Sequence, residues 1–259
     1  MKTKNFVSNT ERLERIVDFI ESRKSITVAE VASEFSIGMT TARRDLDTLA
    51  DQGKIQRVHG GAMALPKAPP EPPALYRTQE QAVEKQKIGR LAAALIEDGD
   101  TVFLGAGTTV MEVARELVNR RDLTVITNSL LVINTLAEAP GINMVVLGGF
   151  FRSSEKSFIG HMTEQALAEF RAAKVVMGVR AVDVELGLTE EFPPEAQTNR
   201  AVLKIGQQVI IVADHTKFGR VAGAFIAPVT AVNIMVTDSN TPQEYIQALE
   251  AQGVRVIKD

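Results

Sequence analysis

Apolar residues near the start of the chain recur at the spacing of an amphipathic helix. Four of them fall at i, i+3, i+4 and i+7 and so share one face of a predicted first helix: Leu13, Ile16, Val17 and Ile20. Ser8 and Glu11 precede this run at the spacing of a capping box. The pattern therefore predicts a helix with one buried face.

Two further helices and a small hairpin follow. Thr27 and Glu30 repeat the capping-box spacing ahead of a short second helix. A third helix is expected over residues 39–51, followed by a strand over residues 54–58 and a glycine turn at 60–61. Three short helices and a hairpin in this order predict a winged helix-turn-helix domain.

After residue 77 the pattern changes to alternating helical and strand segments. The predicted strands are short, nearly continuous apolar runs at residues 101–104, 123–127, 143–147, 175–179, 209–213, 232–236 and 254–257. Runs of this kind are typical of parallel strands that are covered on both faces. Helical patterns lie between most of them, so the second part of the chain is predicted to be an α/β domain with a mainly parallel sheet.

A proline-rich stretch separates the two patterns. Five of the ten prolines fall between Pro66 and Pro73, and each fixes φ and removes an amide donor. We interpret residues 66–76 as a semi-rigid spacer between the winged helix-turn-helix domain at 1–65 and the α/β domain at 77–259. The alternative interpretation is a proline-rich surface loop within one domain.

Composition excludes several classes of protein. The chain of 259 residues contains no cysteine and three histidines, so a disulfide framework is impossible and a zinc site is not expected. No apolar run is long enough for a membrane span, and the start does not resemble a signal peptide, so a cytoplasmic protein without metal or cofactor is expected. The net charge of −3 does not by itself indicate nucleic-acid binding. The first 65 residues nevertheless carry ten basic and nine acidic side chains, against nineteen and twenty-three in the remainder.

The third predicted helix carries the pattern of a DNA-reading element. With its apolar positions facing inward, Thr40, Thr41, Arg43, Arg44 and Asp47 face outward. Thr and Arg can contact phosphates, and Arg can bridge two acceptors of guanine in the major groove. The hairpin would add the side chains of Lys54, Arg57 and His59. The alternative is a solvated helix face on which Arg43 pairs with Asp47 at i, i+4.

These residues resemble the DeoR family of bacterial repressors. The family's hallmark is an Arg-Arg-Asp-Leu recognition helix followed by an Arg-x-His-Gly-Gly-Ala wing, and here the two parts are residues 43–46 and 57–62. The chain departs from the family pattern at Ile37-Gly38, where Val-Ser is usual, and at Ala42, where Ile is usual. Glycine caps a helix only slightly less well than serine, so the resemblance still implies binding to double-stranded operator DNA.

Polar segments at the carboxyl ends of the predicted strands form a second candidate site. Ligands of open α/β sheets bind beyond these strand ends, and glycine-rich turns with hydroxyls can hold a phosphate. The candidate residues are Gly105, Ala106, Gly107, Thr108, Thr109, Thr127, Asn128, Ser129, Gly148, Gly149, Arg152, Asp214 and Lys217. Amides, hydroxyls, two cations and a carboxylate together suit a phosphorylated polyol, although each turn alone could be an ordinary strand-to-helix connection. His215 lies in the last segment and could touch an anion, whereas His161 is expected only to begin a helix.

The same segments resemble the effector domain of DeoR-type repressors, whose fold is similar to that of ribose-5-phosphate isomerase. Gly107–Thr109, Thr127–Ser129 and residues 214–219 match three of the family's landmarks. The resemblance implies a sugar-phosphate effector. The family usually has Asp where Gly105 stands, so the identity of the sugar stays open.

Three functions are compatible with these patterns. The first is a repressor of a carbohydrate operon that a sugar phosphate releases from DNA, acting as a dimer or tetramer because paired half-sites multiply specificity. The second is a sugar-phosphate isomerase, in which a proton could be moved by Asp214, Lys217, Glu190, Glu191 or Glu195. An acidic segment expected of isomerases is absent at residues 178–183, and the acid missing at Gly105 also argues against catalysis. The third is an activator or a ligand-independent regulator.

Overall fold

The computed structural model describes residues 9–259 and divides the chain into two compact units, Met1–Pro66 and Lys67–Asp259. Ser8 of the first predicted capping box lies outside the described residues. None of the described helices combines the length and apolar character needed to cross a membrane.

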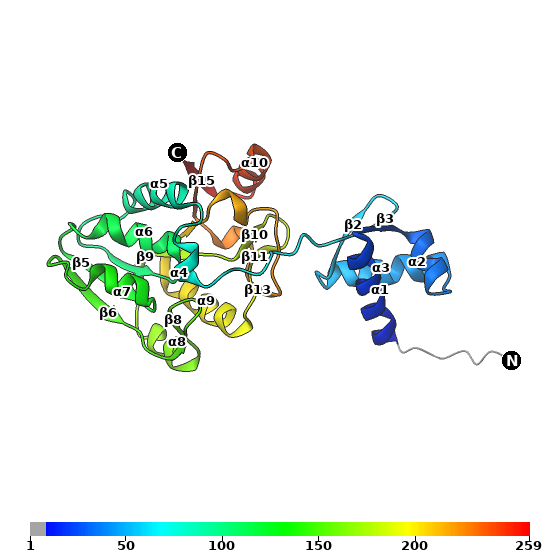
Figure 1. The fold of residues 1–259 in the computed structure, drawn as a ribbon, viewed down its shortest axis with the longest axis horizontal. Helices are drawn as coiled ribbons and strands as arrows, with labels where there is room; N and C mark the ends of the chain where they lie inside the picture. Colours follow the sequence, from blue (N-terminus) through cyan, green and yellow to red (C-terminus); the bar gives the residue numbers. More distant parts are fainter. Residues whose placement is uncertain (1–8) are drawn as a thin grey trace. The chain divides into compact units, whose positions relative to one another are not determined.

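The first unit has the elements of a winged helix-turn-helix (Figure 1). They are α1 (Asn9–Arg23), β1 (Ser25–Thr27), α2 (Val28–Glu34), α3 (Met39–Asp51), β2 (Ile55–Val58) and β3 (Gly61–Ala64). The three strands form an antiparallel sheet in the order β1-β3-β2. Ile16 and Ile20 of α1 and Leu46 and Leu49 of α3 are fully buried in one core, as the helical spacing predicts.

The second capping box is confirmed. Thr27 Oγ1 accepts a hydrogen bond from the Glu30 amide at 3.2 Å, and the Thr27 amide donates to Glu30 Oε2 at 2.7 Å. The two bonds satisfy amides that a helix N-terminus otherwise leaves unpaired, so the short α2 begins at a defined residue.

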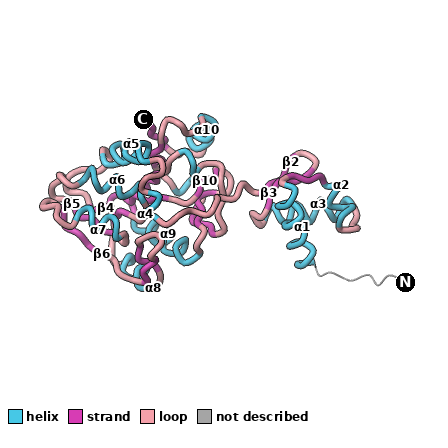
Figure 2. The backbone as a smooth tube through the Cα atoms, viewed as in Figure 1, coloured by secondary structure: helices cyan, strands magenta, loops and turns pink. Residues whose placement is uncertain are grey.

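A seven-stranded parallel sheet forms the centre of the second unit (Figure 2). Its order is β15-β14-β12-β9-β4-β5-β6, and each neighbouring pair runs parallel. The strands are β4 (Thr101–Leu104), β5 (Leu123–Thr127), β6 (Ile142–Val146), β9 (Ala172–Gly178), β12 (Gly206–Val212), β14 (Ile234–Thr237) and β15 (Arg255–Lys258). All seven correspond to predicted strands, with ends that differ by up to three residues.

Helices cover both faces of this sheet, which is why the strands are apolar throughout. One buried cluster joins the sheet to α5 (Ala82–Ala93), α6 (Thr108–Leu117) and α7 (Leu130–Leu136). Another joins it to α8 (His161–Ala168), α9 (Pro193–Ile205) and α10 (Gln243–Ala251). His161 is the first residue of α8, as the sequence predicts.

Several short elements of the second unit lack a clear sequence pattern. They are the helix α4 (Ala74–Arg77), the strands β7 (Phe150–Arg152), β8 (Ser157–Ile159), β10 (Ala181–Asp183), β11 (Gly187–Glu190) and β13 (Ala224–Ala227), and the 3-10 turns η1 (His215–Lys217) and η2 (Val229–Ala231). Strands of three or four residues are too short for a period-2 pattern to identify them.

The proline-rich stretch differs from the predicted spacer. From Lys67 onwards it belongs to the second unit, where Lys67 forms a bridge with Val221 and the Ala68 amide donates to the Val221 carbonyl at 2.9 Å. The Ala74 amide donates to the Ser154 carbonyl at 2.7 Å. Residues 67–74 are therefore attached to the second unit at both ends.

Candidate functional site

The exposed face of α3 carries the predicted DNA-reading residues. Thr40, Arg43 and Arg44 are exposed and Thr41 is half-buried, while Ala42, Leu46 and Leu49 on the opposite face are fully buried. Within residues 9–259, neither Arg43 nor Arg44 forms an ion pair. The alternative pairing of Arg43 with Asp47 is not present, so both guanidinium groups remain available to a ligand.

Asp47 instead pairs with the wing. Its Oδ1 accepts from Arg57 Nε at 2.9 Å, and Arg57 Nη1 also donates to the Gly61 carbonyl. Arg57 is therefore half-buried and holds the hairpin against α3, whereas the neighbouring wing residues Lys54 and His59 are exposed. The direct contact of Arg57 with DNA stays a prediction.

The acidic residue of the Arg-Arg-Asp-Leu motif has a structural role that the sequence pattern did not reveal. Asp45 is buried, and its carboxylate accepts from Arg12 Nε at 2.8 Å and from Arg12 Nη2 at 3.2 Å. This bidentate ion pair joins α1 to α3. It fixes the orientation of the helix that carries Arg43 and Arg44.

A polar cavity in the second unit lies at the carboxyl ends of β4, β9 and β12. Its floor includes Ala106 and Gly107 after β4, Gly178 at the end of β9 and Ala213 after β12. Gly107 is the N-cap of α6 with φ of +117°, a conformation that favours glycine, and it leaves the first amides of α6 without a side-chain cap. This is the position at which parallel α/β sheets bind ligands.

Six of the predicted effector-binding residues line this cavity. They are Ala106, Gly107, Thr108, Thr109, Arg152 and Lys217. They come from three separate segments, which the fold brings together as the strand-end argument predicts.

The other seven predicted residues do not line it, and most are engaged in local structure. Thr127 Oγ1 donates to the Leu104 carbonyl at 2.7 Å, Asn128 Nδ2 donates to the Phe158 carbonyl at 2.8 Å, and Ser129 caps α7. The Gly105 amide donates to the Val176 carbonyl at 2.9 Å within the sheet. Hydrogen bonds to the backbone thus account for Thr127, Ser129 and Asn128 Nδ2, whereas Asn128 Oδ1 is buried without a partner among the described residues.

The remaining members of this group also serve the fold. Gly148 accepts from Thr163 Oγ1 at 2.8 Å, and a Cβ added at Gly149 would lie 2.2 Å from the same oxygen. Asp214 is buried and caps η1 by accepting from the Thr216 amide at 3.0 Å. His215 is held by Asp238, whose Oδ1 lies 3.0 Å from His215 Nδ1.

Sequence reasoning missed several residues that charge the cavity, although it named Glu190, Glu191 and Glu195 as candidate proton-transfer groups for the isomerase alternative. Arg77 at the end of α4, Lys85 on α5 and Arg180 after β9 add three cations to Arg152 and Lys217. Five carboxylates oppose them: Glu71, Glu155, Glu190, Glu191 and Glu195. A charged side chain within a run of prolines, as at Glu71, is the one sequence signal that could have indicated part of this cluster.

Burial shifts the ionisation of several of these groups. Burial lowers the pKa of Lys217 to about 8, against the opposing effect of Asp214 and together with the repulsion of Arg77, Arg180 and Arg220. Burial also lowers the pKa of Lys85, whose Nζ donates to the Arg77 and Glu80 carbonyls at 2.6 Å each, and it raises the pKa of Glu190. Burial thus disfavours the charged form of Lys217, although its Nζ pairs with the Glu71 carboxylate in this structure.

Comparison with known proteins decides the family. A family model described as the DeoR C terminal sensor domain matches residues 80–239, and one described as the DeoR-like helix-turn-helix domain matches residues 12–67. The chain belongs to the DeoR family. This assignment confirms the resemblance of the Arg-Arg-Asp-Leu and wing motifs and the two-part plan of the chain, and it sets aside the isomerase alternative.

Two curated DeoR-type relatives match almost end to end. The transcriptional repressor AccR of Agrobacterium fabrum (strain C58 / ATCC 33970) is 34% identical over 237 residues, which cover 91% of this chain and 92% of the relative. The glycerol-3-phosphate regulon repressor of Escherichia coli (strain K12) is 34% identical over 250 residues, 96% of this chain and 99% of the relative. Among solved structures, ribose 5-phosphate isomerase A from Methanocaldococcus jannaschii matches with a TM-score of 0.40 and 20% identity, covering 54% of this chain and 55% of the isomerase.

Proposed function

We propose that this DeoR-family protein is a cytoplasmic transcriptional repressor of a carbohydrate-catabolism operon, and that a phosphorylated sugar releases it from operator DNA. The observation that carries the proposal is the presence of two separate polar sites on one chain. The first is the exposed cationic face of α3, and the second is the cation-lined cavity at the strand ends. The names of the two relatives, both repressors, support the same function.

On the DNA side, we assign Thr40, Thr41, Arg43 and Arg44 of α3 to the major groove. Their support is exposure combined with the absence of internal ion pairs for the two arginines within residues 9–259. Lys54 and His59 would reach the neighbouring phosphates or the minor groove. Arg57 would act by keeping the wing in place through Asp47, with any contact to DNA as a second role.

On the effector side, we assign the phosphate to Gly107, Thr108 and Thr109. The amides at the N-terminus of α6 and the two threonine hydroxyls are suited to a phosphate, because a helix N-terminus carries partial positive charge. Arg152 and Lys217 line the same cavity and would neutralise the remaining charge. Gly105 is buried and does not line the cavity, whereas the family usually has Asp at this position, so the identity of the sugar is not transferred from the relatives.

Release from DNA follows from linkage. An effector that prefers a conformation unable to span two half-sites weakens DNA binding by the same factor by which DNA weakens effector binding. This mechanism requires at least two DNA-binding units, and we therefore propose a dimer or tetramer.

The proposal is tested with the intact protein and DNA from the region upstream of its own gene. Binding is measured by fluorescence anisotropy while glycerol 3-phosphate and a panel of pentose and hexose phosphates are added. We expect one of these compounds to lower the DNA affinity at least tenfold, and the unphosphorylated sugar to have no effect. If every phosphosugar leaves the affinity unchanged at saturation, the inducible-repressor function is wrong.

A further inference from the structure

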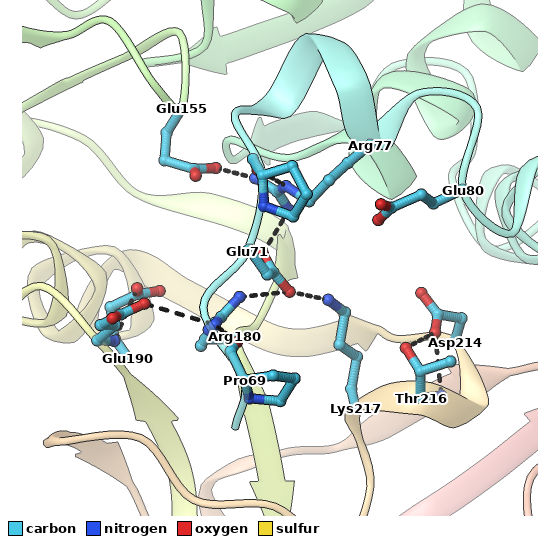
Figure 3. Close-up of polar contacts among 12 residues, drawn as sticks. Pro69, Glu71, Arg77, Glu80, Glu155, Arg180, Glu190, Asp214, Thr216 and Lys217 are labelled. Carbon is cyan, nitrogen blue, oxygen red and sulfur yellow. Dashed lines mark hydrogen bonds and ion pairs between the residues drawn. The ribbon is translucent and has the colours of Figure 1, made fainter. Parts of the chain in front are cut away.

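A carboxylate of the chain itself occupies the cationic part of the sensor cavity (Figure 3). Glu71 Oε2 lies 2.8 Å from Arg77 Nη1, Glu71 Oε1 lies 2.7 Å from Arg180 Nη1, and the same Oε1 pairs with Lys217 Nζ. These side chains are largely removed from water, with exposures of 18% for Glu71, 10% for Arg77, 5% for Arg180 and 17% for Lys217. One carboxylate thus bridges three cations that come from distant parts of the chain.

The backbone next to Glu71 is held by two of the same cations. Arg180 Nη2 donates to the Pro69 carbonyl, and Arg77 Nε donates to the Pro72 carbonyl at 2.9 Å. The prolines in this stretch have no amide to donate, so their part of the segment can attach to the sensor fold only through acceptors. Its central polar attachments therefore depend on Arg77, Arg180 and Lys217.

These cations also have the chemistry of a site for a ligand's anionic group. Arginine and lysine bind phosphate and carboxylate through the same charge-assisted hydrogen bonds, so an incoming phosphate competes directly with the Glu71 carboxylate. Arg180 also has a buried Nε with no hydrogen-bond partner among the described residues, a donor that Glu71 leaves unused. Glu71 lines the same cavity as Gly107, so the Glu71 carboxylate and a phosphate bound at Gly107 would share one space.

We propose that Glu71 is an internal ligand of the sensor site, and that an effector's phosphate displaces it from Arg77, Arg180 and Lys217 and so detaches the segment 67–73. The segment starts directly after Pro66, where the unit that contains α3 ends. Displacement lengthens the free tether between the two units, which links occupancy of the cavity to the placement of the DNA-binding units. The regulatory consequence rests on the proposed function, whereas the competition itself is a property of the sensor unit.

The competition is tested by calorimetric titration of the full chain with inorganic phosphate at constant ionic strength. Glu71→Gln keeps the side-chain shape and removes the charge. If Glu71 occupies the site in about nine-tenths of molecules, its removal raises the phosphate affinity about tenfold. Glu191→Gln is the matched control, because Glu191 Oε2 lies 3.4 Å from Arg180 Nη2 but its side chain is 59% exposed and it belongs to another segment.

For Glu191→Gln we expect the phosphate affinity to rise less than about threefold, because water and salt screen the interactions of an exposed charge. If the two variants gain phosphate affinity equally, the loss of a negative charge alone explains the gain, and the proposed displacement would be overturned. Weaker or absent phosphate binding by Glu71→Gln would overturn it as well. None of these results affects the DNA titration that tests the proposed function, so the two can fail separately.

A second measurement needs no variant. Hydrogen exchange of the wild-type chain is followed at the amides of Ala68 and Ala74, which donate to Val221 and Ser154 in this structure. Saturating phosphate is expected to speed exchange at both amides at least tenfold, with unchanged exchange in β4 and β9 as the internal control. Unchanged or slower exchange at Ala68 and Ala74 would show that the segment stays attached, and the inference would be wrong.

Discussion

The lowered pKa of Lys217 predicts that anion binding to the sensor cavity depends on pH in a defined window. With a pKa of about 8 in the free protein, Lys217 is about 90% charged at pH 7 and about 10% charged at pH 9. A bound phosphate carries more negative charge than the Glu71 carboxylate that it displaces, so it stabilises the charged form further and binding raises this pKa. The affinity is therefore near its maximum at pH 7 and falls as the pH rises through 8, by about tenfold, or about 1.4 kcal/mol, between pH 7 and pH 9.

The control for this prediction is Lys217→Arg, whose guanidinium stays charged throughout this range. Calorimetric titrations with inorganic phosphate are run on both proteins at pH 7, 8 and 9. The ratio of the two affinities cancels the ionisation of phosphate itself and that of Lys85, the other buried lysine at the cavity. The charged groups around Lys217 are Asp214, the nearby arginines and the paired Glu71, and they are also the same in both proteins.

We expect the wild-type affinity to fall about tenfold relative to Lys217→Arg between pH 7 and pH 9. A constant ratio would mean that Lys217 does not hold the anion or that its pKa is not lowered. Either explanation would refute this reasoning, and the first would also remove Lys217 from the effector site.

Three further predictions concern single substitutions. Arg44→Ala should weaken DNA binding by about 1–3 kcal/mol if Arg44 reads a base, as measured by fluorescence anisotropy at several salt concentrations. The control is Asp51→Ala, at an exposed position of the same helix, which should not weaken binding. Equal affinities of Arg44→Ala and the wild type would contradict the assignment of α3. Asp45→Ala removes the ion pair with Arg12, which keeps only its bond to Asn9, and should lower the free energy of unfolding of the first unit by about 1–3 kcal/mol. An unchanged midpoint in urea titrations would show that the pair is not structural. At Gly105 an added Cβ would meet its nearest neighbours at 3.5 Å, an ordinary contact, so Gly105→Asp should fold normally and change the ranking of phosphosugars in a thermal-shift screen. An unchanged ranking would mean that position 105 does not influence the sugar.

The main sheet could be predicted from sequence because its signal is local. Each of its seven strands is a short apolar run between helical patterns, and burial on both faces requires this composition. The capping box at Thr27 and the buried face of α3 are also local, because they depend on residues three or four positions apart. Their prediction needed no knowledge of the tertiary fold.

The residues that line the sensor cavity were harder to predict from the sequence. Glu71, Arg77, Arg180 and Lys217 meet through the fold, and the first and last of them are 146 residues apart. No spacing rule relates residues at such separations. A proline-rich stretch likewise indicates that a segment lies outside helices and sheets, but not whether it is free or attached to a surface.

Polar strand ends were only partly informative. Thr108 and Thr109 line the cavity, whereas Thr127, Asn128 and Ser129 use their hydrogen bonds within the fold. Buried polar groups need partners, and nearby carbonyls and amides can supply them as readily as a ligand can. Sequence alone does not distinguish these two uses.

The most direct test of the central claim is the affinity of the intact protein for its own upstream DNA, measured by fluorescence anisotropy with and without phosphosugars. We predict specific binding that weakens at least tenfold when one phosphosugar saturates the sensor unit, and an unchanged affinity in the presence of the corresponding free sugar. Failure to bind that DNA in preference to unrelated DNA of the same length, or binding that no phosphosugar alters, would contradict the account.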